Sequence, residues 1–136
     1  MAHTLVFEHA IEYLDSPRNV GITIEITLIR GNRRRRIQAK IDTGAEYCIF
    51  QRDYADALDL DVTSGELITF DSAGGPFTAW GHYVTIESFD FQHEALVFFS
   101  DTYGFRRNLL GRRGWIEHVQ LGLIDYQSKL YVSKLQ

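Results

Sequence analysis

Ile41-Asp42-Thr43-Gly44-Ala45 is the stretch that decides the fold of this 136-residue chain. It sets one acid between an apolar strand and a second apolar run at 47–50. Burial disfavours the ionised form of a carboxyl group and raises its pKa. A carboxylate between hydrophobic stretches is therefore either fully hydrogen-bonded or kept for chemistry. Gly44 permits the tight turn or close backbone approach that such a loop needs.

The triplet Asp42-Thr43-Gly44 on its own leaves two interpretations open. It is either an active-site loop or a turn that ends a strand and carries a surface acid. A three-residue motif occurs by chance in unrelated sequences. The elements around it are therefore needed to distinguish the two interpretations.

The residues before Asp42 predict a hairpin whose second strand delivers this acid. Apolar side chains alternate with Gly, Thr and Glu between residues 20 and 28, which is the period-2 pattern of a half-buried strand. Gly31-Asn32 makes the turn, and the alternation resumes from Ile37 to Ile41. The basic run Arg33 to Arg36 is either a phosphate-binding patch or a solvated tip, and the acidic composition of the chain favours the tip.

The residues after Asp42 predict mostly strands. A short helix is expected at 51–60, and two strands at 67–70 and 77–86 flank a turn that contains Gly74-Gly75. Residues 95–99 are apolar on both faces, which predicts a central, buried strand. The count of elements gives an all-β, barrel-like domain with one or two short helices.

A second motif, Leu109-Leu110-Gly111-Arg112, precedes a predicted helix around Trp115 and Ile116 and two terminal strands. Together with the hairpin, Asp-Thr-Gly-Ala and the Gly-rich turn, it makes the chain resemble the retropepsin-like family. This family includes retroviral proteases and the DNA-damage-inducible proteins of eukaryotes. The resemblance implies the closed β-barrel of the acid-protease fold. We expect this domain at 20–136, after an N-terminal arm or strand at 1–19.

The resemblance also implies roles for the residues of the Asp loop. Asp42 matches the catalytic acid, and the hydroxyl of Thr43 matches the group that bonds across a dimer. Gly44 matches the residue whose carbonyl contacts the substrate backbone, and we place Ala45 beside it in the substrate site.

Two charged residues match a structural pair of the family. Arg112 matches an arginine that binds an acid just after the loop, and Glu46 occupies the position of that acid. The resemblance thus implies a Glu46–Arg112 salt bridge, and two unrelated exposed charges are the alternative. Arg113 departs from the family, which often has Asp or Asn at this position.

Residues 71–80 match the flap by position. Gly74 and Gly75 are expected to contact substrate, although family members carry a longer Gly-rich run at the tip. Trp80 either covers the substrate cleft or belongs to the core, and the sequence favours neither.

The chain holds one Asp-Thr-Gly motif and no second copy. In this chemistry, peptide hydrolysis needs two carboxylates that share one proton, one acting on a water and the other polarising the scissile carbonyl. We therefore expect a homodimer in which Asp42 of each chain meets on the two-fold axis, with a peptide or protein as substrate.

Composition excludes several other functions. The net charge of −4 gives no general affinity for nucleic acid, and no apolar run reaches the length of a membrane span. One cysteine and no apparent leader fit a cytoplasmic protein. Cys48 is expected to be a buried, unreactive side chain. The five histidines lack metal-ligand spacing, so we expect no metal and no cofactor.

Three hypotheses follow from the sequence. The first is an aspartic endopeptidase that acts as a homodimer. The second is a retropepsin-like module that dimerises or binds peptides and hardly cleaves them. The third is an unrelated β-barrel that binds nucleic acid through Arg33 to Arg36, against which the acidic net charge argues. The complete triplet Asp42-Thr43-Gly44 favours the first, because a binding module needs no costly pair of acids.

Overall fold

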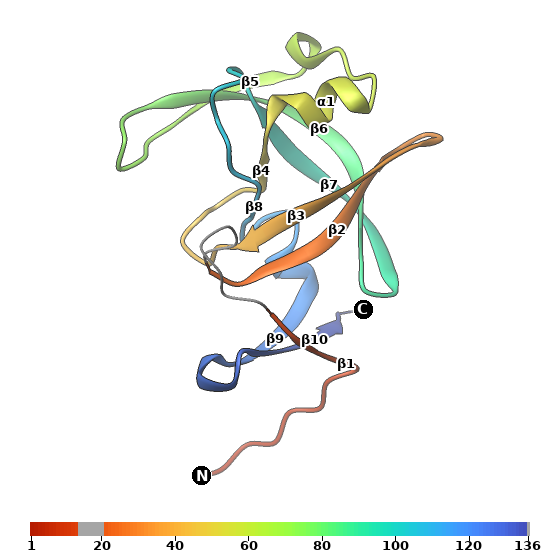
Figure 1. The fold of residues 1–136 in the computed structure, drawn as a ribbon, viewed down its shortest axis with the longest axis vertical. Helices are drawn as coiled ribbons and strands as arrows, with labels where there is room; N and C mark the ends of the chain where they lie inside the picture. Colours follow the sequence, from red (N-terminus) through yellow and green to blue (C-terminus); the bar gives the residue numbers. More distant parts are fainter. Residues whose placement is uncertain (14–20, 136) are drawn as a thin grey trace.

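The computed structural model describes residues 1–13 and 21–135, and strands make up most of it (Figure 1). Among these residues, no helix has the length and apolar character that a membrane crossing requires. The strands are β1 (His9–Glu12), β2 (Thr23–Arg30), β3 (Arg33–Ile41), β4 (Ile49–Phe50), β5 (Glu66–Phe70), β6 (Phe77–Ser88), β7 (Phe91–Ser100), β8 (Leu109–Leu110), β9 (Val119–Ile124) and β10 (Lys129–Lys134). The helical elements are α1 (Arg52–Ala57) and three 3₁₀ turns at Val62–Ser64, Ile116–His118 and Asp125–Gln127.

Seven of these strands form one sheet, and six of them close into a barrel. Their order is β2-β3-β8-β4-β7-β6-β5, and β2 also pairs with β6 from Thr27↔Glu87 to Ile29↔Thr85. This extra pairing joins the two ends of the row into a ring and leaves β5 as an outer strand on β6. The predicted all-β fold with a closed barrel and a short helix is confirmed.

The barrel interior is filled by the alternate side chains that the period-2 pattern predicts. Leu28, Ile86, Val97 and Phe99 are fully buried there, and β7 lies between β4 and β6 as expected for a strand apolar on both faces. Burying one such side chain contributes about 1.5–3 kcal/mol, so these residues supply much of the stability of the barrel.

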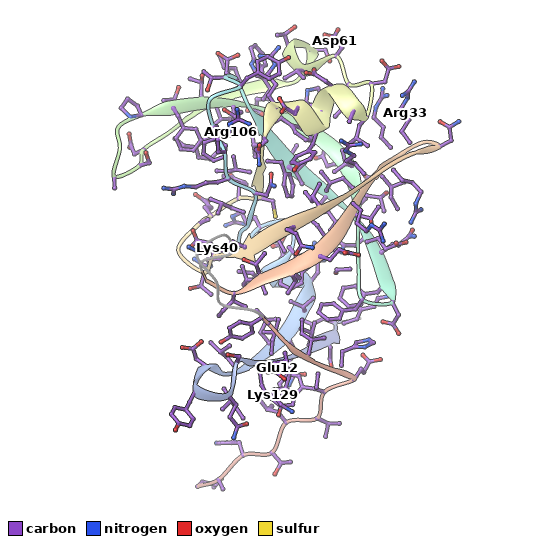
Figure 2. The ribbon with its side chains drawn as sticks, in the orientation of Figure 1. Glu12, Arg33, Lys40, Asp61, Arg106 and Lys129 are labelled. Atoms are coloured by element: carbon purple, nitrogen blue, oxygen red, sulfur yellow. The ribbon has the colours of Figure 1, made fainter. Side chains whose placement is uncertain are left out.

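The terminal segments form a second, three-stranded sheet in the order β1-β10-β9. Glu12 lies opposite Lys129 in this sheet, and both are labelled in the lower part of Figure 2. The ring of Phe7 lies over the sheet, 5.7 Å from the ring of Tyr131. The strand β1 falls within the segment expected to be an arm or strand. The expected boundary at 19–20 and the turn at 16–19 lie outside the described residues.

One sequence expectation changes in the structure, and a neighbouring one holds. The helix predicted around Trp115 is a single 3₁₀ turn at Ile116–His118, because Gly114 has a φ of 106° and Trp115 a φ of −142°, neither of which is helical. The turn at the tip of the β2–β3 hairpin is as predicted, with Gly31 at a φ of 60°.

The basic run at this tip, where Figure 2 labels Arg33, has acidic partners. Three of its four arginines have an acidic partner: Arg33 with Asp59 at 3.8 Å, Arg34 with Glu87 at 2.9 Å and Arg36 with Glu25 at 3.8 Å. Such exposed pairs contribute little stability, but they balance much of the charge that a phosphate would need. This arrangement favours the solvated tip over the phosphate-binding patch.

Candidate active site

The loop that carries Asp42 crosses the end of a short central strand. Strand β3 runs parallel to β8, with Ile41 opposite Leu110, and β4 runs antiparallel to β8, with Ile49 opposite Leu109. The chain therefore leaves β3, passes over β8 and returns on the far side as β4. These pairings fix the position of the Asp loop relative to the buried Leu109 and Leu110.

Asp42 is held by backbone hydrogen bonds on three sides. Its N–H donates to Leu110 O at 3.0 Å, and its carbonyl accepts from Ala45 N–H at 3.1 Å. The N–H of Gly44 donates to Oδ1 of Asp42 at 2.9 Å, which turns the carboxylate back over its own loop. A side chain at Gly44 would crowd this oxygen, because a Cβ there would stand 3.2 Å from it.

The environment of Asp42 differs from the buried site that the apolar flanks predicted. In this single chain Asp42 is half-buried, and Thr43 and Gly44 are exposed. The reason is that the apolar residues on either side turn inward from β3 and β4, whereas the loop between them turns outward. Ala45 is half-buried beside them, so the four residues of the motif form one accessible edge.

The Leu109-Leu110-Gly111-Arg112 motif, called the clamp below, binds the Asp loop through backbone hydrogen bonds. Arg112 N–H donates to Ala45 O at 2.9 Å, and Arg113 N–H donates to Glu46 O at 2.7 Å. Gly111 is required for this approach, because a Cβ at this position would stand 2.2 Å from Tyr47 O. The two sequence motifs are therefore joined through their backbones.

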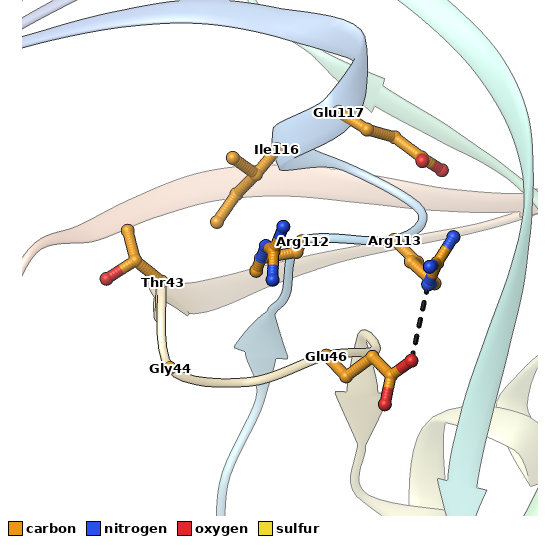
Figure 3. Close-up of a pocket in the computed structure, with 7 residues that line it drawn as sticks. All are labelled: Thr43, Gly44, Glu46, Arg112, Arg113, Ile116 and Glu117. Carbon is orange, nitrogen blue, oxygen red and sulfur yellow. Dashed lines mark hydrogen bonds and ion pairs between the residues drawn. The ribbon is translucent and has the colours of Figure 1, made fainter.

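The predicted Glu46–Arg112 salt bridge is wrong for this chain. Glu46 Oε1 instead lies 3.3 Å from Nε of Arg113, an exposed pair drawn as the dashed line in Figure 3. The isolated parallel bridge between Tyr47 and Arg113 brings the Arg113 side chain to the Glu46 side of the loop. Within the described residues, the guanidinium of Arg112 has no hydrogen bond or ion pair, and it lies near Thr43 and Ile116 (Figure 3).

A hollow of 610 Å³ lies beside the loop, on the side of the 3₁₀ turn (Figure 3). Its lining is mostly charged or polar and consists of Thr43, Gly44, Glu46, Arg112, Arg113, Ile116 and Glu117. Asp42 is not among these residues. The hollow therefore lies beside the Asp loop without being lined by the Asp42 carboxylate.

The expected flap is the hairpin of β5 and β6. Its tip is a turn in which Gly75 N–H donates to Ser72 O at 3.0 Å and Ser72 Oγ donates to Gly75 O at 2.6 Å. Nothing lies within 4 Å of a Cβ built at Gly74 or Gly75. In this chain the two glycines thus project into open space and touch no other element.

Trp80 lies at the base of the flap, where it is half-buried against the barrel core. Its indole N–H donates to Oδ1 of Asp101 at 2.8 Å, and Arg52 of α1 donates to Asp101 O at 2.7 Å. These contacts join the flap base to α1. They describe a structural side chain, and the expected substrate role of Trp80 stays a prediction.

The sequence did not single out an aromatic group between the flap and the Asp loop. The ring of Tyr47 lies 4.9 Å from Phe98 and 6.0 Å from Phe70 of the flap. Phe77 stacks on Phe70 and on Phe105, each at 5.3 Å. The sequence did contain a signal for this group, because aromatic residues stand at both ends of the flap and shortly after the Asp-Thr-Gly motif. This group belongs to a small hydrophobic cluster, separate from the main core, that packs the β5–β6 hairpin against Tyr47.

Two further groups lie behind the clamp. Burial raises the pKa of the Cys48 thiol to about 12, so it stays protonated and unreactive, as expected. His93 and His118 stack with ring centroids 4.2 Å apart, and His93 Nε2 lies 2.6 Å from Gly114 O. Among the described residues, no cluster of three or more His, Cys, Asp or Glu side chains could hold a metal ion.

Comparisons with known proteins agree with this geometry. A family model described as "Aspartyl protease" matches residues 24–113, which include both motifs. A solved structure of EIAV protease, in complex with the inhibitor HBY-793, matches with a TM-score of 0.54 and 16% identity. The match covers 73% of this chain and 88% of the EIAV chain. No curated protein matches the sequence.

Proposed function

Because this chain belongs to the aspartyl protease family, we propose that it hydrolyses peptide bonds as a homodimer with one Asp42 from each chain. The observation that carries the proposal is the geometry of Asp42. Its carboxylate stands at the accessible edge of a loop that is fixed by backbone hydrogen bonds to Leu110 and Ala45. A fixed, accessible acid suits the hydrolysis of a peptide that is held in a defined orientation.

The proposed mechanism uses the two carboxylates as a pair. Two carboxylates about 3 Å apart cannot both ionise, so the dyad holds one shared proton and titrates as a unit. The ionised carboxylate takes a proton from water, and the oxygen of that water attacks the scissile carbonyl carbon. The protonated carboxyl group donates a hydrogen bond to the carbonyl oxygen and stabilises the charge that develops there. Collapse of the tetrahedral intermediate then releases the amine, which takes up a proton from the dyad.

The neighbouring residues have roles in this proposal. Gly44 N–H orients the carboxylate of its own chain, and the exposed Thr43 hydroxyl is available to bond across the two-fold axis. Gly44, Ala45 and the flap glycines Gly74 and Gly75 are the groups proposed to contact the peptide backbone. Dimerisation would bury Asp42 further, and this is the environment that its apolar flanks predicted. The cytoplasmic location expected from the sequence stays a prediction.

The test is the cleavage of a peptide library by the wild-type chain and by Asp42→Asn, between about pH 4 and pH 7. Asp42→Asn keeps the shape of the side chain but cannot form a dyad. We expect the variant to fold normally and to lose cleavage by at least about 1,000-fold, as other enzymes do when a catalytic group is removed. Asp53→Asn, on the exposed start of α1, is the matched control and should cleave like the wild type.

The same experiment separates the proposal from a module that binds peptides and hardly cleaves them. Equal, low cleavage by the wild type and Asp42→Asn, with peptide binding retained in both, would favour the binding module. Inhibition of the wild type by pepstatin, which targets aspartic proteases, would add an independent argument for the peptidase.

A further inference from the structure

The loop at 101–108, between β7 and β8, carries two adjacent arginines that the proposed mechanism does not use. Arg106 and Arg107, called the arginine pair below, are both exposed. Within the described residues, neither side chain has a hydrogen bond or an ion pair. Most of the other arginines in the described ranges do have such a partner, and the further exceptions are Arg35 and Arg112.

The residues on either side fix the position of the arginine pair. Phe105 stacks on Phe77 at the base of the flap, with ring centroids 5.3 Å apart. The carbonyl of Asn108 accepts a hydrogen bond from Lys40 N–H at 2.8 Å, and its side-chain amide donates to Gln38 O at 3.2 Å. The arginine pair therefore spans the short distance from the flap base to β3, the strand that ends at the Asp loop.

This position is close enough to Asp42 for contact with a bound peptide. Arg107 stands three positions before Leu110, whose carbonyl accepts the hydrogen bond from Asp42 N–H at 3.0 Å. Three residues of extended chain span at most about 10 Å. A peptide residue two or three positions from the scissile bond lies about 7–10 Å from it. In the view of Figure 2, Arg106 is labelled below the β5–β6 hairpin and above Lys40.

The acid of the same loop does not neutralise the arginine pair. Asp101 accepts a hydrogen bond from the indole N–H of Trp80 at 2.8 Å, and its Oδ1 lies 3.4 Å from the guanidinium of Arg52. Two adjacent charges of the same sign raise the local positive potential, which attracts an anionic group. The basic run at the tip of the β2–β3 hairpin differs, because most of its charge is already balanced by acids.

We propose that the arginine pair binds an acidic side chain of the substrate, so that cleavage favours peptides with Asp or Glu within about three residues of the scissile bond. A planar guanidinium can donate two parallel hydrogen bonds to a carboxylate, which gives this contact direction as well as attraction. The inference rests on the proposed function, because that function is what places a peptide beside Asp42.

The first test compares matched peptides that differ in one charge. In a peptide that the wild type cleaves, Glu or Gln is placed at one position at a time, over the three positions on each side of the cleaved bond. At one of these positions or more, kcat/KM should be about 10-fold higher for the Glu peptide, because hydrogen bonds between charged groups are stronger than neutral ones. Added salt should reduce this preference.

The second test assigns the preference to the arginine pair. In Arg106→Gln/Arg107→Gln, the Glu and Gln peptides should have similar values of kcat/KM. In Arg106→Glu/Arg107→Glu, a Lys peptide should be preferred over the Glu peptide. Both side chains are exposed, so urea unfolding should show that the variants fold like the wild type.

The matched control is Arg35→Gln. It also removes an exposed arginine that has no partner among the described residues, but this arginine belongs to the basic run at the tip of the β2–β3 hairpin. The preference for the Glu peptide should persist in this variant.

The outcomes separate this inference from the proposed function. Equal cleavage of the Glu and Gln peptides at every position, or a Glu preference that persists in Arg106→Gln/Arg107→Gln, would overturn the role of the arginine pair and leave the peptidase intact. If the wild type cleaves no peptide, the proposed function fails, and the affinity for acidic and neutral library peptides, measured by fluorescence anisotropy, decides the inference. Tighter binding of acidic peptides that is lost in Arg106→Gln/Arg107→Gln would support it, and equal binding would overturn it.

Discussion

The clamp behind Asp42 and the tip of the flap both depend on glycine, for opposite physical reasons. A Cβ at Gly111 would stand 2.2 Å from Tyr47 O, so glycine is there because no space remains. At Gly74 nothing lies within 4 Å, so glycine is there to leave the backbone free. Gly111 lets the clamp approach the candidate catalytic acid, whereas Gly74 leaves the backbone of the hairpin tip unhindered. The same residue type thus gives no indication of its role until its neighbours are known.

The largest expected effect comes from filling the crowded position. Gly111→Ala forces the clamp away from the Asp loop and strains its hydrogen bonds, the one from Arg112 N–H to Ala45 O among them. We expect the free energy of unfolding to fall by about 4 kcal/mol or more, in the range of severe core substitutions. Urea unfolding followed by fluorescence measures this change.

The matched control is Gly74→Ala at the flap tip, where the added methyl group meets no atom. The free energy of unfolding should change by less than about 0.5 kcal/mol, as for other exposed surface positions. A similar loss of stability in both variants would contradict the distinction between a crowded Gly111 and an open Gly74.

A smaller effect is expected at the aromatic residues near the base of the β5–β6 hairpin. Phe77 of the flap stacks on Phe70 and on Phe105. Phe77→Ala removes half-buried aromatic contacts and should lower the free energy of unfolding by about 1–2 kcal/mol. It should also raise KM for peptides more than it lowers kcat, because the flap loses contacts that position it above the cleft. Leu67→Ala, on the opposite face of the same hairpin and half-exposed, should change neither.

The smallest expected effect concerns the histidine pair behind the clamp. Burial is the main cause that lowers the pKa of His93 below its ordinary value of 6.5, and the nearby His118 and Lys134 act in the same direction. The contact with Gly114 O and the charge of Glu117 oppose this shift. The folded state therefore binds a proton less readily than the unfolded state, so this contribution to stability is complete above about pH 6.5 and is lost as the pH falls.

Unfolding in urea at pH 7.5 and at pH 5.5 tests this direction. Wild-type stability should be lower at pH 5.5, and His93→Gln should reduce the difference between the two pH values. His82→Gln is a useful comparison, because His82 lies at the other end of the barrel and contacts Val62 O. A pH dependence that is unchanged in His93→Gln would contradict the assignment.

The sequence predicted the parts of the fold that depend on local pattern. The alternation in β2 and β3, the two glycines at the flap and the two motifs are short-range signals, and each corresponds to an element or a contact in the structure. The element count predicted an all-β, barrel-like domain, and the family resemblance implied that the barrel is closed. The family resemblance supplied the link between Asp42 and the Gly111 motif, which no spacing alone could give.

The contacts that the sequence missed depend on how distant backbones align. Glu46 has Arg113 as its partner and not Arg112, because the Tyr47–Arg113 bridge decides which of two adjacent arginines faces it. His93 and His118 come from different elements and share no spacing that would mark them as neighbours. Where strands cross, the direction of a side chain depends on how two distant segments align. Local sequence patterns do not contain this information.

The pairing of β1 with β10 has a consequence for the order in which the protein folds. His9 lies opposite Val132. Strand β1 can therefore join its sheet only after the residues around Val132 have been synthesised. Contacts between residues so far apart in sequence form late, because a long loop must close first. A chain that is still being synthesised would already contain Asp42 and its clamp, but not the complete terminal sheet. We therefore expect β1 to join its sheet only after β10 has been synthesised and has folded onto β9.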